Sequence, residues 1–481
     1  MPRLSRAAAR RWDARLQARI GRLPASRADG VLRQLSQAAD HGKLWLAVGL
    51  ALGAKQGAPR RAAARGLGSL LVSSALVNVV LKPVFGRVRP DPAGAAAADR
   101  VLDRTPHTLS FPSGHSASAA AFATGVAMES PWAGALVAPV ALGVGYSRVH
   151  VGVHYPGDVL AGMAVGGAVA AATRHWWPVR PSTPARVRPT ERAPALPGGA
   201  GLHVAVNPRS GRADYDPAAD IAALLPGAVV VEIDDEHSVT DVLEEAVRAG
   251  ARALGVAGGD GSVAAAAAVA LAHGLPLAVL PAGTLNHFAR DVGVATPVEA
   301  ARAVEAGDGV LVDVAAVNGV PFLNTASIGS YPEMVRRRDA LRGKLGTWLA
   351  LTVAAGQVLR TGQPVELEVD GRRTSAWILF VGNGVYTPRG LSPAWRPALD
   401  DGLLDVQYLR ADLRWGRTRA VLATLLGASE RSRSYRQFQV PRLTVRSLSG
   451  PQAVAYDGET GDAGTEFVFT KRQRLVVYRL R

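Results

Sequence analysis

Apolar segments separated by short polar stretches dominate the first third of the chain. A membrane-spanning helix needs about 20 apolar residues, and charge is nearly absent inside these segments. The pattern therefore predicts an all-α transmembrane helical bundle; the alternative is a soluble bundle rich in alanine. The segment 44–54 is too short to span a bilayer, so its status stays open. The other predicted segments are 67–82, 116–130, 132–147 and 157–173.

Residues 1–40 form a basic segment ahead of these apolar stretches, with many arginines and few acidic residues. No apolar core occurs early enough for a cleavable signal peptide, so none is expected. Four large apolar residues recur at helical spacing beside the arginines, which predicts a helix lying on an anionic membrane surface. The alternative is a basic helix packed on its own protein. The four residues are Trp12, Leu16, Ile20 and Leu23.

From residue 200 onward, short apolar strands alternate with helices, and glycine-rich loops follow the strands. This order predicts an α/β nucleotide-binding lobe over 200–310, with ligand-binding loops at the strand ends. Segments with period-two alternation then predict a mainly antiparallel β lobe over 311–481. The expected strands of the α/β lobe are 203–206, 229–233, 253–257 and 277–280. Those of the β lobe are 365–369, 376–381, 404–409, 443–445 and 467–469.

A proline- and arginine-rich stretch, 179–199, separates the two patterns and is interpreted as a linker. It follows Trp176 and Trp177, a pair typical of a membrane interface. Arginines placed directly after a span predict that the chain continues in the cytoplasm. The expected organisation is therefore a basic segment 1–40, a membrane domain 41–178, this linker, and a two-lobed domain 200–481.

The composition narrows the classes of partner. The net charge of +16 and the pI of about 10.8 favour an acidic partner, such as an anionic lipid or a phosphorylated substrate. Basic runs interleaved with aromatic residues are lacking, which disfavours nucleic acid. The chain contains no cysteine, so disulfides, thiolate nucleophiles and iron–sulfur clusters are excluded.

Charged clusters stand at three ends of the apolar segments: Lys82–Pro90, Phe111–His115 and Ser147–Asp158. A Pro-Ser-Gly turn that delivers a histidine at a helix start suits an anion, because backbone N–H groups are free there. If the segments alternate across a bilayer, all three clusters emerge on the same side. Placing cationic side chains at membrane depth costs free energy, so the convergence of several cations there indicates a site that binds an anion.

These clusters resemble the type 2 phosphatidic acid phosphatase family. The family pattern is Lys-x6-Arg-Pro, Pro-Ser-Gly-His and Ser-Arg-x5-His-x3-Asp, and the chain matches it without a gap. The resemblance implies that His154 is the nucleophile forming a phosphohistidine, Asp158 orients it, and His115 protonates the leaving group. It requires no metal. It also implies that the phosphoryl oxygens are bound by Lys82, Arg89, Ser113, Gly114 and Arg148.

A second glycine-rich loop, Gly258–Ser262, follows a predicted strand. It lacks the Lys-Ser/Thr ending of a Walker A loop, although its N–H groups can still close on a phosphate. The alternative for this loop alone is a tight turn. The polar segments Asn207–Gly211 and Gly283–Asp291 follow neighbouring strands, which favours a shared binding site.

Together these segments resemble the diacylglycerol kinase catalytic family, which includes sphingosine kinases and bacterial lipid kinases. The resemblance implies ATP and Mg²⁺, with Asp401 anchoring a magnesium-centred network and Asp457 acting as general base. Both residues precede a glycine and could instead belong to hairpin turns. The implied nucleotide-binding residues are Asn207, Ser210, Gly211, Gly259, Asp260, Gly261, Ser262, Thr284 and Asn286; Ser262 stands where threonine is commoner.

The two resemblances imply a bifunctional membrane lipid enzyme, with membrane lipids and ATP as partners and no nucleic acid. It would be a multi-pass protein of the cell (inner) membrane, with the kinase in the cytoplasm and the phosphatase site on the opposite side. One alternative is a lipid kinase with a catalytically silent membrane anchor. Another is a lipid-binding or lipid-translocating protein. Oligomeric state and substrates stay open.

Overall fold

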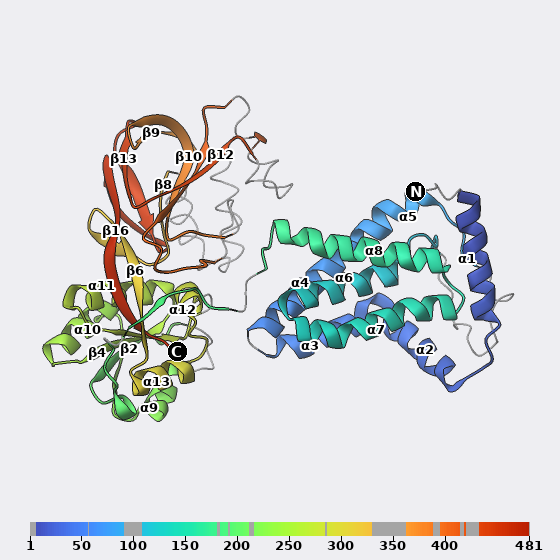
Figure 1. The fold of residues 1–481 in the computed structure, drawn as a ribbon, viewed down its shortest axis with the longest axis horizontal. Coiled ribbons are helices and arrows are strands. Elements are labelled where there is room, and N and C mark those ends of the chain that lie inside the picture. The colour runs from blue at the N-terminus through green and yellow to red at the C-terminus, as the bar shows by residue number, and fades with distance from the viewer. Residues whose placement is uncertain are drawn as a thin grey trace. The chain divides into compact units, whose positions relative to one another are not determined.

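The computed structural model describes residues 6–55, 57–90, 108–179, 183–190, 193–210, 216–283, 286–329, 362–387, 395–413, 418–419 and 432–480. The chain divides into two compact units, Met1–Ser182 and Thr183–Arg481 (Figure 1). Each unit is described by itself.

All regular secondary structure in the described part of the first unit is helical. Every apolar segment expected from the sequence forms a helix. Two further helices, α1 (Arg6–Gly21) and α2 (Arg27–Ala38), precede them. The helices of the bundle are α3 (Lys43–Gly53), α4 (Ala58–Ala75), α6 (Gly114–Glu129), α7 (Pro131–His150) and α8 (Pro156–Ala172). Helix α4 continues through a π-helical turn, η2 (Leu76–Leu81), into α5 (Lys82–Phe85).

Small residues pack the interior of this bundle. A Cβ on Gly166 of α8 would lie 2.1 Å from the carbonyl oxygen of Ala117 on α6, so only glycine permits this close approach. Large apolar side chains, including Leu50, Leu71 and Leu136, are exposed. Small residues inside and large apolar residues outside are typical of helices that pack within lipid.

Two of the described helical stretches are long and apolar enough to cross a membrane, Ala58–Phe85 and Pro156–His175. Helix α6, by contrast, has 16 residues and ends at the buried Glu129. The prediction of a helical bundle therefore holds, while the number of spans stays a prediction.

Helix α1 packs on its own unit through polar residues. Asp13 accepts a hydrogen bond from the N–H of Gly157, and Gln17 donates to the carbonyl of Val149. The predicted apolar face lies elsewhere, with Trp12 and Leu23 exposed. One face thus follows the alternative of packing on the protein, and membrane contact by the other face stays a prediction.

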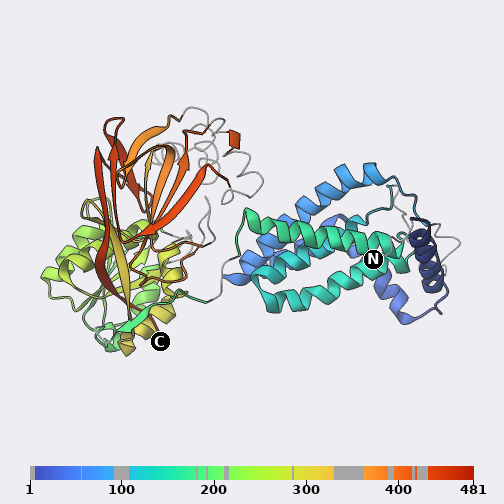
Figure 2. The same ribbon diagram turned by 45° about the horizontal axis from the view of Figure 1, so that its top comes forward.

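The first lobe of the second unit is α/β, as predicted. Its parallel strands lie in the order β3 (Val229–Glu232), β2 (Leu202–Val206), β4 (Ala253–Gly258) and β5 (Leu277–Pro281). Figure 2 shows the helices of this lobe around the sheet. They are α9 (Pro217–Leu224), α10 (Val239–Arg248), α11 (Asp260–His273), α12 (His287–Val292) and α13 (Pro297–Ala306).

The second lobe is an antiparallel sheet with its own apolar core, also as predicted. Strand β10 pairs with three antiparallel neighbours, β8, β9 and β11. The bounds of the lobe's strands are β7 (Val320–Phe322), β8 (Thr325–Gly329), β9 (Val365–Val369), β10 (Arg372–Asn383), β11 (Leu404–Arg410), β12 (Tyr435–Val440), β13 (Arg442–Ser447), β14 (Gln452–Tyr456) and β15 (Glu459–Gly464).

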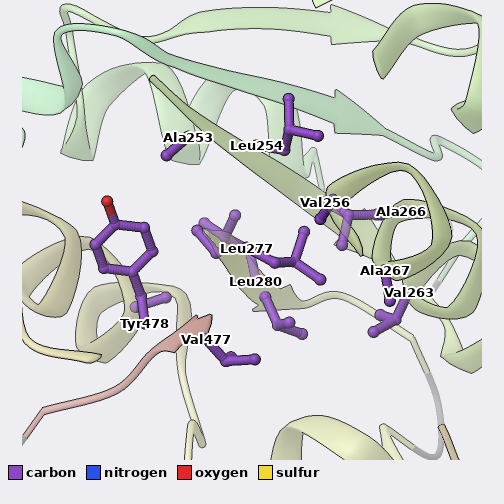
Figure 3. Packing of buried hydrophobic residues seen from close by; sticks show 14 of the residues in the cluster. Ala253, Leu254, Val256, Val263, Ala266, Ala267, Leu277, Leu280, Val477 and Tyr478 are labelled. Carbon is purple, nitrogen blue, oxygen red and sulfur yellow. The ribbon is translucent and has the colours of Figure 1, made fainter. Parts of the chain in front are cut away.

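Two long strands, β6 (Gly309–Val317) and β16 (Glu466–Tyr478), pair with each other and run through both lobes. Phe467 and Phe469 lie in the core of the second lobe, whereas Val477 and Tyr478 lie in that of the first. Figure 3 shows these last two residues beside side chains of β4, β5 and α11. The lobes therefore do not divide at 310/311 as expected, because the C-terminal strand returns to the first lobe.

The expected linker also differs in the structure. Residues from Thr183 onward belong to the second unit, where β1 (Arg188–Thr190) pairs with β6. Ala185 donates its N–H to the carbonyl of Asp291, and Leu196 is fully buried. The sequence did not predict that this segment packs on the second unit, because a proline-rich segment with many arginines lacks the alternation of apolar and polar residues that indicates a strand.

Candidate functional site

The three charged clusters of the first unit meet in the structure. His154, in the loop between α7 and α8, lies with its Nε2 3.1 Å from Nη1 of Arg89. Its Nδ1 lies 3.5 Å from Oδ2 of Asp158. Both His154 and Asp158 are buried. The predicted nucleophile, its orienting carboxylate and one predicted phosphate-binding arginine are therefore neighbours.

The contacts of His154 fix how its ring can react. A guanidinium only donates hydrogen bonds, so the Nε2 that faces Arg89 must be the unprotonated nitrogen. The proton then stays on Nδ1, on the side of Asp158. Burial lowers the pKa of His154 to about 3, which keeps the ring neutral at physiological pH. A neutral imidazole with an unprotonated Nε2 is the form that can attack phosphorus.

The Pro-Ser-Gly-His turn is fixed against both neighbouring clusters. Ser113 donates its N–H to the backbone carbonyl of Asp158 and caps α6 by accepting from the N–H of Ser116. A Cβ on Gly114 would lie 3.7 Å from Nζ of Lys82, so the ammonium stands at the N-terminus of α6. The ammonium and the first N–H groups of the helix can bind one anion together.

Asp40, a residue the sequence analysis missed, contacts the predicted acid. Nε2 of His115 donates to Oδ1 of Asp40 at 2.7 Å. The same carboxylate lies 3.8 Å from Arg148, whose guanidinium also donates to Oγ of Ser36. Nε of Arg148 is buried without a hydrogen-bond partner among the described residues, which leaves a donor for a ligand.

Arg87 and Asp13 form a second missed group, behind Asp158. Nη1 of Arg87 lies 2.8 Å from Asp158 and 2.8 Å from Asp13 of α1. Its guanidinium also stacks over the ring of Tyr155. Asp13 and Asp40 carried no signal in the sequence, because a single carboxylate far from the motifs shows its partner only after folding.

In the second unit, the predicted loops meet at the carboxyl ends of β2, β4 and β5. Nδ2 of Asn207 donates to Oγ of Ser262 at 3.2 Å, and Gly259 donates its N–H to Oγ of Ser210 at 3.3 Å. Asp260 accepts from the N–H of Phe288. Helix α11 begins at Asp260, so its unpaired N–H groups face this meeting point.

The arrangement fits a nucleotide phosphate. A Cβ on Gly283 would lie 2.6 Å from the Cα of Gly259, so the loops approach as closely as glycine allows. Oδ1 of Asn286 is buried without a partner among the described residues and can accept from a nucleotide hydroxyl or amino group. Gly261 follows in the first turn of α11, whereas the predicted Gly211 and Thr284 lie outside the described residues.

The predicted base, Asp457, is held by backbone groups. Its carboxylate accepts the N–H groups of Leu323, Asn324 and Thr325 at 2.7, 2.8 and 3.2 Å. Burial nevertheless raises the pKa of Asp457 to about 6. Glu459, which the sequence analysis did not single out, points at the glycine loop: its Oε1 lies 3.2 Å from a Cβ placed on Gly261.

Arg396 fixes the same segment from its other side and was also missed. Its buried guanidinium donates to the carbonyls of Leu323 and Asn383 and pairs with Asp291 at 2.8 Å. Asp291 belongs to the first lobe, so this residue ties the glycine-loop region to the β lobe. The sequence placed Asp291 in a motif without indicating this partner.

Asp401 does not fit a bound metal ion in this structure. Its Oδ1 accepts a hydrogen bond from the ammonium of Lys471 at 2.5 Å and from the N–H of Leu403 at 3.0 Å. Its Oδ2 accepts from the N–H of Val385 at 3.0 Å. The cation at this carboxylate is a lysine, contrary to the expectation of magnesium.

Comparison with known proteins agrees with this division. Residues 63–182 match the PAP2 superfamily and residues 201–317 match the diacylglycerol kinase catalytic domain. The chain is 33% identical over 228 residues to a probable lipid kinase (YegS-like) of Pseudomonas aeruginosa, covering 45% of this chain and 73% of that protein. It is 40% identical over 133 residues to decaprenylphosphoryl-5-phosphoribose phosphatase of Mycolicibacterium smegmatis, covering 27% of this chain and 68% of that protein.

The chain belongs to both families. Its first unit carries the PAP2 domain and its second unit the diacylglycerol kinase domain, which confirms both resemblances. Named relatives support a phosphatase and a lipid kinase within one chain.

A third relative, an uncharacterized protein of Synechocystis, is 30% identical over 213 residues. That match covers 42% of this chain and 49% of the relative, so the chain spans about half of that protein's length. Asp13, Ser36 and Asp40 precede the PAP2 match, which begins at residue 63. The contacts that α1, α2 and Asp40 make with the candidate site therefore come from residues outside the matched domain.

Proposed function

We propose that the chain is a bifunctional membrane lipid enzyme, a metal-independent lipid-phosphate phosphatase fused to an ATP-dependent lipid kinase. The observation that carries the phosphatase is His154, whose unprotonated Nε2 faces Arg89 while Nδ1 faces Asp158. Lys82 and Arg148 stand near the same turn. A lipid-binding protein needs cations for a phosphate but has no use for a nucleophile oriented in this way.

In the phosphatase, Nε2 of His154 would attack the phosphorus of the lipid phosphate. The P–O bond to the lipid breaks as the P–N bond forms, and His115 gives its proton to the leaving oxygen. Lys82, Arg89, Arg148, Ser113 and the N–H of Gly114 would hold the phosphoryl oxygens. Water, activated by the now neutral His115, then cleaves the P–N bond and releases phosphate.

In the kinase, the N-terminus of α11 and the polar residues around it would hold the phosphates of ATP. Magnesium accompanies ATP as part of that substrate. A carboxylate takes the proton of the lipid hydroxyl as the hydroxyl oxygen attacks the γ-phosphorus, and the bond from that phosphorus to the bridging oxygen breaks, so that ADP leaves. We assign this role to Glu459, because its Oε1 lies by Gly261, and assign to the sequence-predicted base, Asp457, the positioning of 323–325.

The relatives indicate the kind of substrate. Their names include a decaprenylphosphoryl-5-phosphoribose phosphatase, a lipid A 1-phosphatase and a probable lipid kinase. We propose that this chain likewise acts on a phosphoryl group or a hydroxyl carried by a membrane lipid. The exposed apolar side chains of the bundle, such as Leu50 and Leu71, support a multi-pass protein of the cell (inner) membrane.

The two activities should be separable by mutation. In purified full-length protein, His154→Ala removes the nucleophile and should abolish lipid-phosphate hydrolysis while lipid phosphorylation persists. Asp260→Ala disturbs the glycine loop and should have the opposite effect. A panel of lipid phosphates and lipid alcohols with labelled ATP measures both. Wild-type protein that phosphorylates lipid but hydrolyses no lipid phosphate would support the silent-anchor alternative instead.

Asp40 should position His115 and favour its protonated form. Asp40→Asn should lower the kcat of the phosphatase about 10- to 100-fold with little change in KM. The alkaline limb of the pH–rate profile should move to lower pH, because the imidazolium loses its carboxylate partner. Asp40→Glu should restore part of both. An unchanged pH profile in Asp40→Asn would contradict this role.

The two carboxylates of the Asp457–Glu459 turn should differ in effect. Glu459→Gln should lower the kinase kcat at least about 100-fold without changing thermal stability. Asp457→Asn should lower thermal stability, because the new amide cannot accept every N–H group that the carboxylate accepts. If Asp457 were the base instead, its pKa of about 6 would make kinase activity fall as the pH drops through that value. A stable but inactive Asp457→Asn would establish that assignment.

The kinase should lie in the cytoplasm and the phosphatase site on the opposite side of the membrane. The chain has no cysteine, so a single introduced thiol reports one position. Val88→Cys, beside the phosphatase site, should react with an impermeant maleimide on intact spheroplasts, and Thr183→Cys only after permeabilisation. Labelling of both from the same side would refute this topology.

A further inference from the structure

A buried lysine stands where the family resemblance expects a metal ion. Lys471 lies on β16, and its side chain is 0% exposed. The inward face of this strand also carries Phe467 and Phe469, and the pairing of β16 with β6 shifts register between Thr470 and Gln473. An ammonium at this depth costs free energy unless fixed partners surround it.

Oxygen atoms of the Asp401 loop are those partners. Nζ of Lys471 donates to Oδ1 of Asp401 at 2.5 Å and to the carbonyl of Leu403 at 3.1 Å. A carboxylate and a backbone carbonyl converging on one point are the ligands that hard cations prefer. Gly384 has no side chain to fill the space beside the ammonium. A Cβ on Gly384 would lie 3.4 Å from Nζ of Lys471 and 3.5 Å from the carbonyl oxygen of Ala398.

A divalent ion on Oδ1 of Asp401 would have to displace the ammonium of Lys471. Mg²⁺ demands oxygens at about 2.0–2.1 Å in octahedral geometry, and two cations at one oxygen repel each other strongly at low dielectric. Oδ1 of Asp401 also accepts the N–H of Leu403, and Oδ2 accepts the N–H of Val385. Among the described residues, no group of three or more His, Cys, Asp or Glu could hold a metal ion.

We infer that the Lys471 ammonium is the resident cation of the Asp401 loop and replaces the divalent ion expected there. The inference concerns the scaffold of the second unit and holds whether or not the proposed lipid phosphorylation is correct. The Asp401 loop is linked to the candidate kinase site by hydrogen bonds. Asp401 accepts the N–H of Val385. The next residue, Tyr386, donates its hydroxyl to the carbonyl of Asn324. Asn324 is one of the residues that Asp457 fixes. A covalently attached charge would therefore keep this network intact without free Mg²⁺.

Hydrogen–deuterium exchange of the full-length protein in detergent, without nucleotide, tests the inference. The amides of 385–387 and 399–405 should exchange equally slowly in EDTA and in millimolar MgCl₂ in the wild type. In Lys471→Met the same amides should exchange at least about tenfold faster in EDTA, because Asp401 loses its counter-charge. MgCl₂ should restore their protection, and adding Asp401→Asn should abolish that rescue.

Arg472→Met is the matched control, since Arg472 is the next residue of β16 and is exposed. It should leave exchange in this loop unchanged. Protection of the wild-type loop that depends on Mg²⁺ and is lost in Asp401→Asn would overturn the inference. Lys471→Met with wild-type exchange, or without rescue by MgCl₂, would also overturn it. The wild-type measurement decides the question even if Lys471→Met fails to fold.

Discussion

Buried charge must find a fixed partner of opposite charge, and this constraint organises both units. In the first unit Arg65 pairs with Glu129 at 2.8 Å, with both side chains almost fully buried. In the second unit Arg396 pairs with Asp291 at the same distance. Removing one partner of such a pair costs about 3–5 kcal/mol, because the other charge stays buried alone. Each pair therefore specifies which elements pack together.

The two candidate phosphate sites also have their charges and donors fixed in advance, partly by neutral oxygens. Helix α6 begins at Gly114 and helix α11 begins at Asp260, each directly after a turn that exposes N–H groups. Around the first turn, cations are fixed by neutral oxygens or by carboxylates outside the reacting position, as Lys82 is by Asn78 and Arg148 by Ser36. Groups already oriented toward an anion need little reorganisation when the phosphoryl charge develops.

Charged residues from outside the matched domains complete both networks. Asp13 and Asp40 come from the N-terminal segment, whose arginines suggested only a membrane surface. In the second unit the C-terminal strand supplies Lys471 to a loop some seventy positions earlier in the chain. These contributions explain why the N-terminal helices and the last strand are integral parts of their units.

The sequence by itself determined which residues could react and which local elements carry them. The spacing from Lys82 to Asp158 and the loops from Asn207 to Asp291 indicated the candidate phosphate sites, because turn chemistry, glycine and strand or helix periods are local properties. The apolar segments likewise marked every helix of the bundle. Only the tertiary structure decided which charge meets which. Asp40 at His115, Glu459 at the glycine loop and Lys471 at Asp401 are contacts between distant segments. Such pairings depend on burial and on the geometry of the packed elements, and a single residue in the sequence carries no record of either.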